Sequence, residues 1–230
     1  MSDSLALRDD EDGGSDPDEV IVPESRPHRR ASALIAAAAA RCLGAGREVD
    51  ANLNWYPSDA GPPIAPDVMV LPPGVLDRAA RSFRQPADGP GPEAVVEVPS
   101  TSDEHLRFLE KLRRYQRLGT IVYIVVTAPA ALDVTRLAPG DDEPSRWLGR
   151  ACPELGGLFF QVHDDRIAVR TPDGLVATDV EELLAGLDER AHAAQAQVEA
   201  AHAQAEAASL EAARLAELLR RHGLDPAAET

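Results

Sequence analysis

Residues 91–119 constrain the fold of this chain more than any other stretch. They begin with the apolar, β-branched run 94–98 (AVVEV), which is typical of a buried strand, and continue into a helical pattern. Thr101 and Ser102 are N-cap residue types, and Glu104 follows Thr101 by three positions, as in a capping box. We therefore expect a strand that leads directly into a helix, within an α/β domain.

The predicted helix carries an unusual cation. Its buried side is expected to consist of the apolar residues that recur at helical spacing, which are Leu106, Leu109, Leu112 and Tyr115. Lys111 lies between two of these positions and is the only lysine among the 23 basic residues of the chain. Because arginine is preferred everywhere else, this lysine suggests a site that needs a compact point charge.

Two acids occupy apolar strands. Glu97 lies inside the run 94–98, and Asp67 lies inside a second run, 64–71 (IAPDVMVL). Two such carboxylates with a nearby lysine indicate a site for a hard divalent cation such as Mg²⁺, which accepts carboxylates, water and phosphate oxygens. A metal there could activate water, and Lys111 could orient that water or stabilise an oxyanion.

Simpler interpretations stay open for each residue. A single acid in an apolar strand is commonly a strand-end residue or a hydrogen-bonded structural carboxylate, and Tyr115 is more readily explained as core. Glu24 and His28, before the first expected helix, could add a ligand or serve as exposed or capping residues. Three arginines of the predicted helix could contact phosphates or simply form a solvated basic face; they are Arg113, Arg114 and Arg117.

Other elements follow from periodicity and turn residues. Helices are expected at 29–43 and from residue 180 onward, and a loop connection is expected at 72–92. Strands are expected at 47–55, 64–71, 94–98, 120–127 and 131–137, with a hairpin at 159–169 that turns at 163–165.

The chain after Leu187 has a heptad pattern rich in alanine. Its seam alternates spacings of four and three, at Leu187, Ala191, Ala194, Val198, Ala201, Ala205, Ala208, Ala212, Leu215 and Leu219. Alanine has the highest intrinsic helix propensity, so a long helix is expected. Oligomerisation, or packing back on the same domain, is the expected role.

Charge and cysteine content restrict the class of protein. The net charge is −16, with 39 acidic and 23 basic residues, and this opposes nonspecific attraction to nucleic acid. Part of the excess lies in residues 1–18, an acidic segment expected to be disordered. Cys42 and Cys152 form no CxxC pair, and no signal peptide or membrane span is recognised, so we expect a cytoplasmic protein.

These motifs together resemble the Uma-two family of restriction endonucleases, within the PD-(D/E)xK restriction-endonuclease-like superfamily. The matching pieces are DPDEVIVPESRPH near the start, Pro66-Asp67, Val96-Glu97-Val98, Glu110-Lys111-Leu112 with Tyr115, Gly119 with Tyr123, and the terminal LLRRHGLDP, from about Glu19 to Asp225. In that family the lysine lies on the helix after the strand, which fits Pro99 at the usual lysine position. Two positions depart from the family pattern: Arg107 replaces an acid, and Thr127 replaces a strand-end aspartate.

The resemblance implies a fold, a domain plan and a function. It implies an α/β domain at 19–185 with a mixed central sheet flanked by helices, and the heptad pattern adds a coiled-coil helix at 186–223, followed by a tail at 224–230. It implies a Mg²⁺- or Mn²⁺-dependent endonuclease acting on DNA, with Asp67 and Glu97 as metal ligands and Lys111 as the catalytic lysine. The partners are then nucleic acid and further copies of the chain. The rival is a non-catalytic module of this fold that acts through its coiled coil.

Overall fold

A mixed six-stranded sheet forms the centre of the protein. The computed structural model describes residues 26–59, 61–75, 82–99 and 105–222. The strand order is β1-β3-β5-β6-β7-β8, and in this sheet β5 and β6 are parallel while the other neighbours are antiparallel. The strands are β1 (Glu48–Asp50), β3 (Val68–Leu71), β5 (Ala94–Glu97), β6 (Ile121–Val126), β7 (Asp133–Leu137) and β8 (Ser145–Arg146).

The parallel pair follows from the strand–helix–strand pattern of the sequence. Helix α2 (His105–Arg117) connects β5 to β6, and parallel neighbours need such a crossover. Buried strands of a parallel pair are continuous apolar runs, as in β5, where all four residues are buried, and in β6, where the central four are. The predictions of a central mixed sheet and of strands at 94–98 and 120–127 are confirmed.

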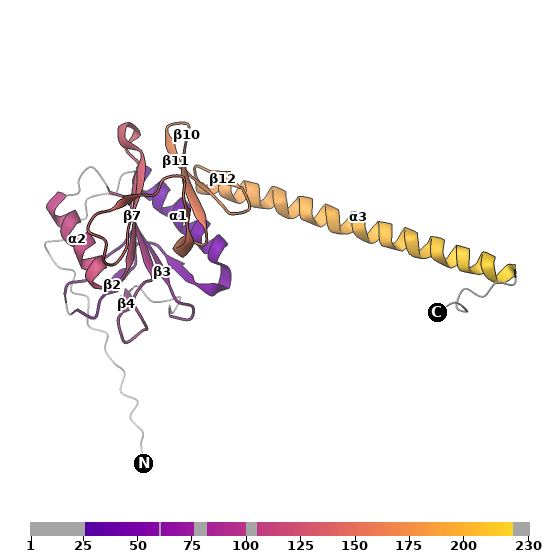
Figure 1. The fold of residues 1–230 in the computed structure, drawn as a ribbon, viewed down its shortest axis with the longest axis horizontal. Helices are drawn as coiled ribbons and strands as arrows, with labels where there is room; N and C mark the ends of the chain where they lie inside the picture. The colour runs from indigo at the N-terminus through magenta and orange to yellow at the C-terminus, as the bar shows by residue number, and fades with distance from the viewer. Residues whose placement is uncertain (1–25, 60, 76–81, 100–104, 223–230) are drawn as a thin grey trace, which may run out of the picture.

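Helices cover the two faces of this sheet (Figure 1). Helix α1 (Arg26–Leu43) lies on one face and α2 on the other. Side chains of a strand alternate between faces, so Val96 packs in the cluster on the α1 side while Val95 packs in the cluster on the α2 side. The alternation places Glu97 on the α2 side, together with Val95.

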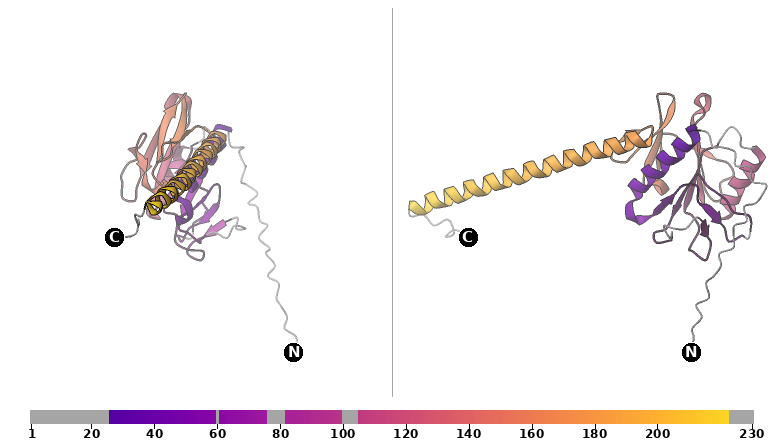
Figure 2. Two further views of the ribbon diagram at one scale, coloured as in Figure 1. Left: turned by 90° about the vertical axis from the view of Figure 1, so that its right-hand side faces the viewer. Right: turned by 180° about the vertical axis from the view of Figure 1, so that it is seen from behind.

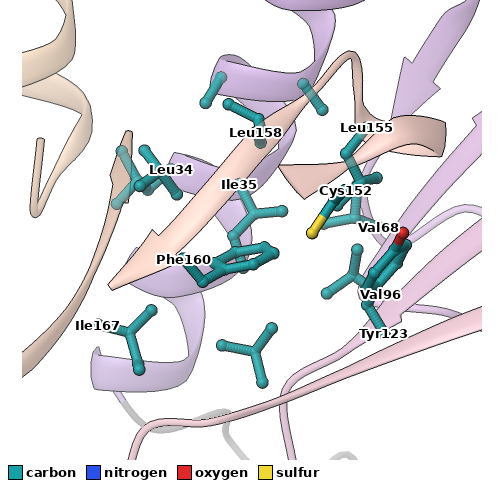
Figure 3. Packing of buried hydrophobic residues seen from close by; sticks show 14 of the residues in the cluster. Leu34, Ile35, Val68, Val96, Tyr123, Cys152, Leu155, Leu158, Phe160 and Ile167 are labelled. Carbon is teal, nitrogen blue, oxygen red and sulfur yellow. The ribbon is translucent and has the colours of Figure 1, made fainter. Parts of the chain in front are cut away.

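A second sheet closes the α1 side of the core. Its order is β12-β11-β10-β9, and its strands are β9 (Ala151–Cys152), β10 (Leu158–His163), β11 (Arg166–Arg170) and β12 (Val176–Ala177). The expected hairpin is β10–β11, and its turn uses Asp164 and Asp165 at positive φ. Figure 3 shows side chains of this sheet, of α1 and of the central sheet converging in one apolar cluster that includes Ile35, Val96 and Phe160.

The α2 side of the core is smaller and contains three of the five buried aromatic residues in the described part of the chain, Trp55, Phe83 and Tyr115. Strands β2 (Asn54–Tyr56) and β4 (Ser82–Arg84) form a parallel pair there. Trp55 stacks on Tyr115 of α2, with ring centroids 6.1 Å apart. This packing fixes α2 against β2, and with it the orientation of the side chains that α2 presents to Glu97. Short 3₁₀ helices complete the chain at η1 (Gly44–Gly46), η2 (Pro129–Ala131) and η3 (Pro153–Leu155).

Helix α3 (Val180–Arg221) extends away from the domain as a rod (Figures 1 and 2). Asp179 caps it by accepting a hydrogen bond from the Glu182 N–H, and Leu183 anchors its first turns in the core. The 42 residues of α3 correspond to about 63 Å at 1.5 Å per residue. The predicted long helix is confirmed, whereas pairing along its seam stays a prediction.

Three sequence predictions on local structure are wrong. The strand expected at 47–55 is two strands in different sheets, because Asn52 has φ of 59° and turns the chain between β1 and β2. The connection at 72–92 contains β4, since Phe83 is buried beside the α2-side cluster and aligns the chain with β2. Leu106 is 74% exposed because it lies in the first turn of α2, outside the cluster that Leu112 and Tyr115 join.

Several predictions lie outside the described residues. They are the acidic segment 1–18, Glu24, the capping residues Thr101, Ser102 and Glu104, and the tail 224–230. Among the described helices, none combines the length and apolar character needed to cross a membrane.

Candidate functional site

The two acids singled out from the sequence are cross-strand neighbours. β3 and β5 pair with Val68 opposite Val96, so one step further along this antiparallel register sets Asp67 opposite Glu97. Side chains directly opposite in such a pair lie on the same face, and like charges there destabilise the sheet. The pair sits at the end of both strands and is buried, with Asp67 8% and Glu97 4% exposed. Such an arrangement needs compensating donors.

Both oxygens of Glu97 accept hydrogen bonds from α2. Lys111 Nζ donates to Oε2 at 2.8 Å, and the Tyr115 hydroxyl donates to Oε1 at 2.6 Å. Lys111 and Tyr115 are four residues apart and therefore lie on the same face of the helix. One helix face thus supplies a charge and a neutral donor to the same carboxylate.

Lys111 also connects the site to the chain before β3. Its Nζ donates a second hydrogen bond, to the Ala65 carbonyl oxygen at 3.0 Å. The lysine side chain is 28% exposed, so the ammonium group lies between the buried carboxylate and solvent. A compact ammonium with three donors can hold two protein acceptors and still face a ligand.

Asp67 is held by different partners. The Val98 N–H donates to Oδ2 at 2.6 Å, and His28 Nε2 lies 3.0 Å from Oδ1. His28 belongs to the first turn of α1, and its side chain is only 10% exposed. The helix therefore begins before His28, and this residue reaches the site from the α1 side of the sheet. The exposed or capping role left open for it does not apply.

Burial sets the protonation of the site. Desolvation raises the pKa of Glu97, the nearby Lys111 charge opposes that shift, and the Asp67 charge adds to it. Desolvation also raises the pKa of Tyr115 well above its ordinary value, with Glu97 as a further cause. The hydroxyl of Tyr115 therefore stays protonated at neutral pH and acts as a donor.

The donor set suits a hard cation. Among the residues that the structure describes, no three His, Cys, Asp or Glu side chains cluster as a metal-binding group. Asp67 and Glu97 offer two carboxylates, and Mg²⁺ is commonly bound by one or two carboxylates with water completing its coordination. The residues present therefore fit such an ion.

The structure brings together all three residues predicted for the site. Glu97 and Lys111 are in contact, and Asp67 lies next to Glu97 on the neighbouring strand. The contact of Tyr115 with Glu97 was missed, although its spacing of four from Lys111 was a signal. The contact of His28 with Asp67 had no signal beyond the residue type, since α1 and β3 are far apart in sequence. The chemical roles of these residues remain predictions.

A central mixed sheet flanked by helices, with two carboxylates side by side at one end of its interior strands, defines a mixed α/β fold. The Uma2 (Uma-two) family model, described as "Putative restriction endonuclease", matches residues 17–146. This match spans more than half of the chain, and the protein belongs to the Uma2 family. It ends at β8, so the second sheet and α3 lie beyond it, whereas the resemblance of the sequence reached about Asp225.

The chain is also similar to solved structures. One of them comes from Anabaena variabilis ATCC 29413 and is described as a "putative nuclease belonging to DUF820". The two chains are 13% identical with a TM-score of 0.44, and the match covers 57% of this chain and 73% of the other. No curated protein matches the chain.

Proposed function

We propose that the protein is a Mg²⁺- or Mn²⁺-dependent endonuclease that hydrolyses phosphodiester bonds, with DNA as its expected substrate. The observation that carries the proposal is the buried pair of Asp67 and Glu97 with Lys111 Nζ 2.8 Å from Glu97. Membership of a family described as restriction endonucleases supports the same chemistry.

Each residue has a distinct role in this proposal. Asp67 and Glu97 hold the metal, which supplies activation of water and neutralisation of phosphate charge when bound. Lys111 orients the attacking water or donates to the phosphate oxygen that gains negative charge. The water oxygen bonds to phosphorus and releases a proton to solvent, the bond from phosphorus to the leaving oxygen breaks, and that oxygen takes up a proton from solvent.

Tyr115 and His28 act as positioning residues. The hydroxyl of Tyr115 fixes the carboxylate plane of Glu97, and His28 fixes that of Asp67 on the opposite side. Partners of this kind orient metal-binding carboxylates and increase the affinity for metal. Without metal, Lys111 partly compensates the buried Glu97 charge.

Cleavage of pooled DNA and RNA with Mg²⁺ or Mn²⁺ tests the proposal. Lys111→Ala is expected to reduce the rate by about 10²–10³, the loss typical of one donor to a developing oxyanion. Glu189→Gln, at an exposed position of α3, is the control that keeps wild-type activity. Cleavage that is equal in wild type and Lys111→Ala, or absent from wild type with either metal, contradicts the proposal.

Metal binding separates an enzyme from the non-catalytic rival. Titration of Mn²⁺ into Asp67→Ala and Glu97→Ala is expected to show weaker binding than in wild type, because each variant removes one of two carboxylates. Unchanged Mn²⁺ affinity in both variants would favour the module without catalysis.

Helix α3 supports an additional proposal, that the protein self-associates through this rod. Val198 and Leu215 lie on the heptad seam and are 62% and 54% exposed, although apolar seam residues are normally buried by a partner helix. Light scattering after size-exclusion chromatography should show an oligomer for wild type and a monomer for a Val198→Glu, Leu215→Glu double variant. A monomeric wild type at high concentration contradicts this proposal.

A further inference from the structure

A basic groove lies beside the carboxylate pair. It has a volume of about 870 Å³ and runs between α2 and a loop that lines it with Asp59 and residues 61–65. Lys111 and Ala65 line it, and the hydrogen bond between these two residues also joins Lys111 to the site. The groove therefore opens directly onto the group proposed to contact the phosphate.

The lining of the groove is cationic in a protein that is strongly anionic. Five basic and two acidic side chains face it, against a net charge of −16 for the chain. The basic residues all belong to α2 and are Arg107, Lys111, Arg113, Arg114 and Arg117. A local concentration of one sign in a concave surface attracts ligands of the opposite sign. The ligand that fits this groove is therefore an anion.

Arg114 shapes the groove. Its Nε and Nη2 donate to the two carboxylate oxygens of Asp59 at 2.9 and 2.7 Å, and its Nη1 donates to the Pro62 carbonyl oxygen at 2.6 Å. A Cβ at Gly61 would lie 2.4 Å from Arg114 Nη2, so a larger residue there would displace the guanidinium group from its present position. Arg114 thus fixes the loop to α2 and holds the groove open without a ligand.

Arg113 and Arg117 differ from Arg114 in exposure. Both side chains are exposed to solvent, and both line the groove. Arg117 follows Lys111 by six residues, which is about 9 Å along the helix axis at 1.5 Å per residue. Successive charges of one strand of duplex DNA are about 3.4 Å apart along its axis. Lys111 and Arg117 are therefore far enough apart along α2 to contact different phosphates of one strand.

We infer that this groove binds the phosphodiester backbone of the substrate on one side of the scissile bond, through Arg113 and Arg117. The inference rests on the proposed nuclease function and specifies where the strand continues from the catalytic site. Contacts of this kind position the strand without reading its sequence. The overall negative charge then limits binding elsewhere on the surface, so that attraction is concentrated at the site.

Fluorescence anisotropy in EDTA tests the groove without cleavage. Labelled duplex DNA, single-stranded DNA and RNA of one sequence are titrated over a series of salt concentrations. The Arg113→Gln, Arg117→Gln double variant should bind more weakly than wild type, and the slope of log affinity against log salt should fall by about 1 for each arginine. The matched control is Arg214→Gln, an exposed arginine on the rod of α3, which should bind as wild type does.

The outcomes separate the two proposals. Wild type that cleaves nucleic acid while the groove variant keeps its full affinity and salt slope overturns the groove and leaves the nuclease function intact. Wild type that neither binds nor cleaves any of the three substrates overturns both. Weaker binding by the groove variant alone supports the groove, and the substrate with the largest change identifies the strand that occupies it.

Discussion

The hydroxyl of Tyr115 offers a sharp test of how the site is organised. In Tyr115→Phe the aromatic ring and its stacking on Trp55 remain, but the 2.6 Å hydrogen bond to Glu97 is lost. Tyr115 is fully buried and Glu97 is 4% exposed, so water cannot readily replace the donor. A hydrogen bond to a charged group contributes about 1.5–3 kcal/mol. We expect the free energy of unfolding to fall by this amount.

The same variant should bind metal less tightly. Without the hydroxyl, the Glu97 carboxylate is less well oriented, and loss of such a partner typically lowers metal affinity 10–100-fold. This factor corresponds to about 1.4–2.8 kcal/mol, since each tenfold change is about 1.4 kcal/mol. Isothermal titration with Mn²⁺ measures the affinity, and urea denaturation measures the stability of the same preparation.

Tyr123→Phe is the matched control. Tyr123 is also fully buried, and its hydroxyl donates to the carboxylate of Glu154 in the cluster on the α1 side of the sheet. This variant should lose stability but keep the wild-type Mn²⁺ affinity. If Tyr115→Phe loses stability and still binds Mn²⁺ as tightly as wild type, the hydroxyl only satisfies a buried carboxylate and the reasoning is refuted.

Three further outcomes follow from burial and charge. The hydrogen bond from Arg114 lowers the pKa of Asp59 to about 2. A carboxyl with a lowered folded-state pKa stabilises the protein at pH values above its ordinary pKa, and this stabilisation is lost as the pH falls toward 2. The urea midpoints of Asp59→Asn and wild type should therefore differ at pH 7 and converge at about pH 2. Burial raises the pKa of Glu97, and a raised pKa has the opposite effect: the stability of the wild type decreases as the pH rises through it. The melting temperature of Glu97→Gln relative to wild type should therefore increase with pH. A difference that stays constant with pH would contradict this. Phe160→Ala, at a fully buried position, should lower the unfolding free energy by about 3–5 kcal/mol in urea denaturation, whereas Val162→Ala, at a position 47% exposed on the same strand, should have a much smaller effect.

The sequence by itself determined the elements whose signals are local. The β-branched run at 94–98, the helical spacing of Leu109, Leu112 and Tyr115, and the apolar run at 120–127 predicted a strand–helix–strand unit. Periodicity and propensity depend on neighbours a few residues away, so they can be read without the fold. The same holds for the alanine-rich helix from residue 180 onward, whose length follows from propensity alone.

Tertiary structure alone decided the contacts across long stretches of chain. The register of β3 against β5 sets Asp67 opposite Glu97, and α1 brings His28 to Asp67, across separations that no local pattern encodes. Residues 47–55 alternate in polarity like a single strand, but the turn at Asn52 and the pairing of β2 with β4 divide them between two sheets. Strand pairing depends on which distant partner buries a given face, and the groove depends on the loop that Arg114 fixes to α2. Residue types and spacing could therefore indicate the candidate residues, while only packing could bring them into one site.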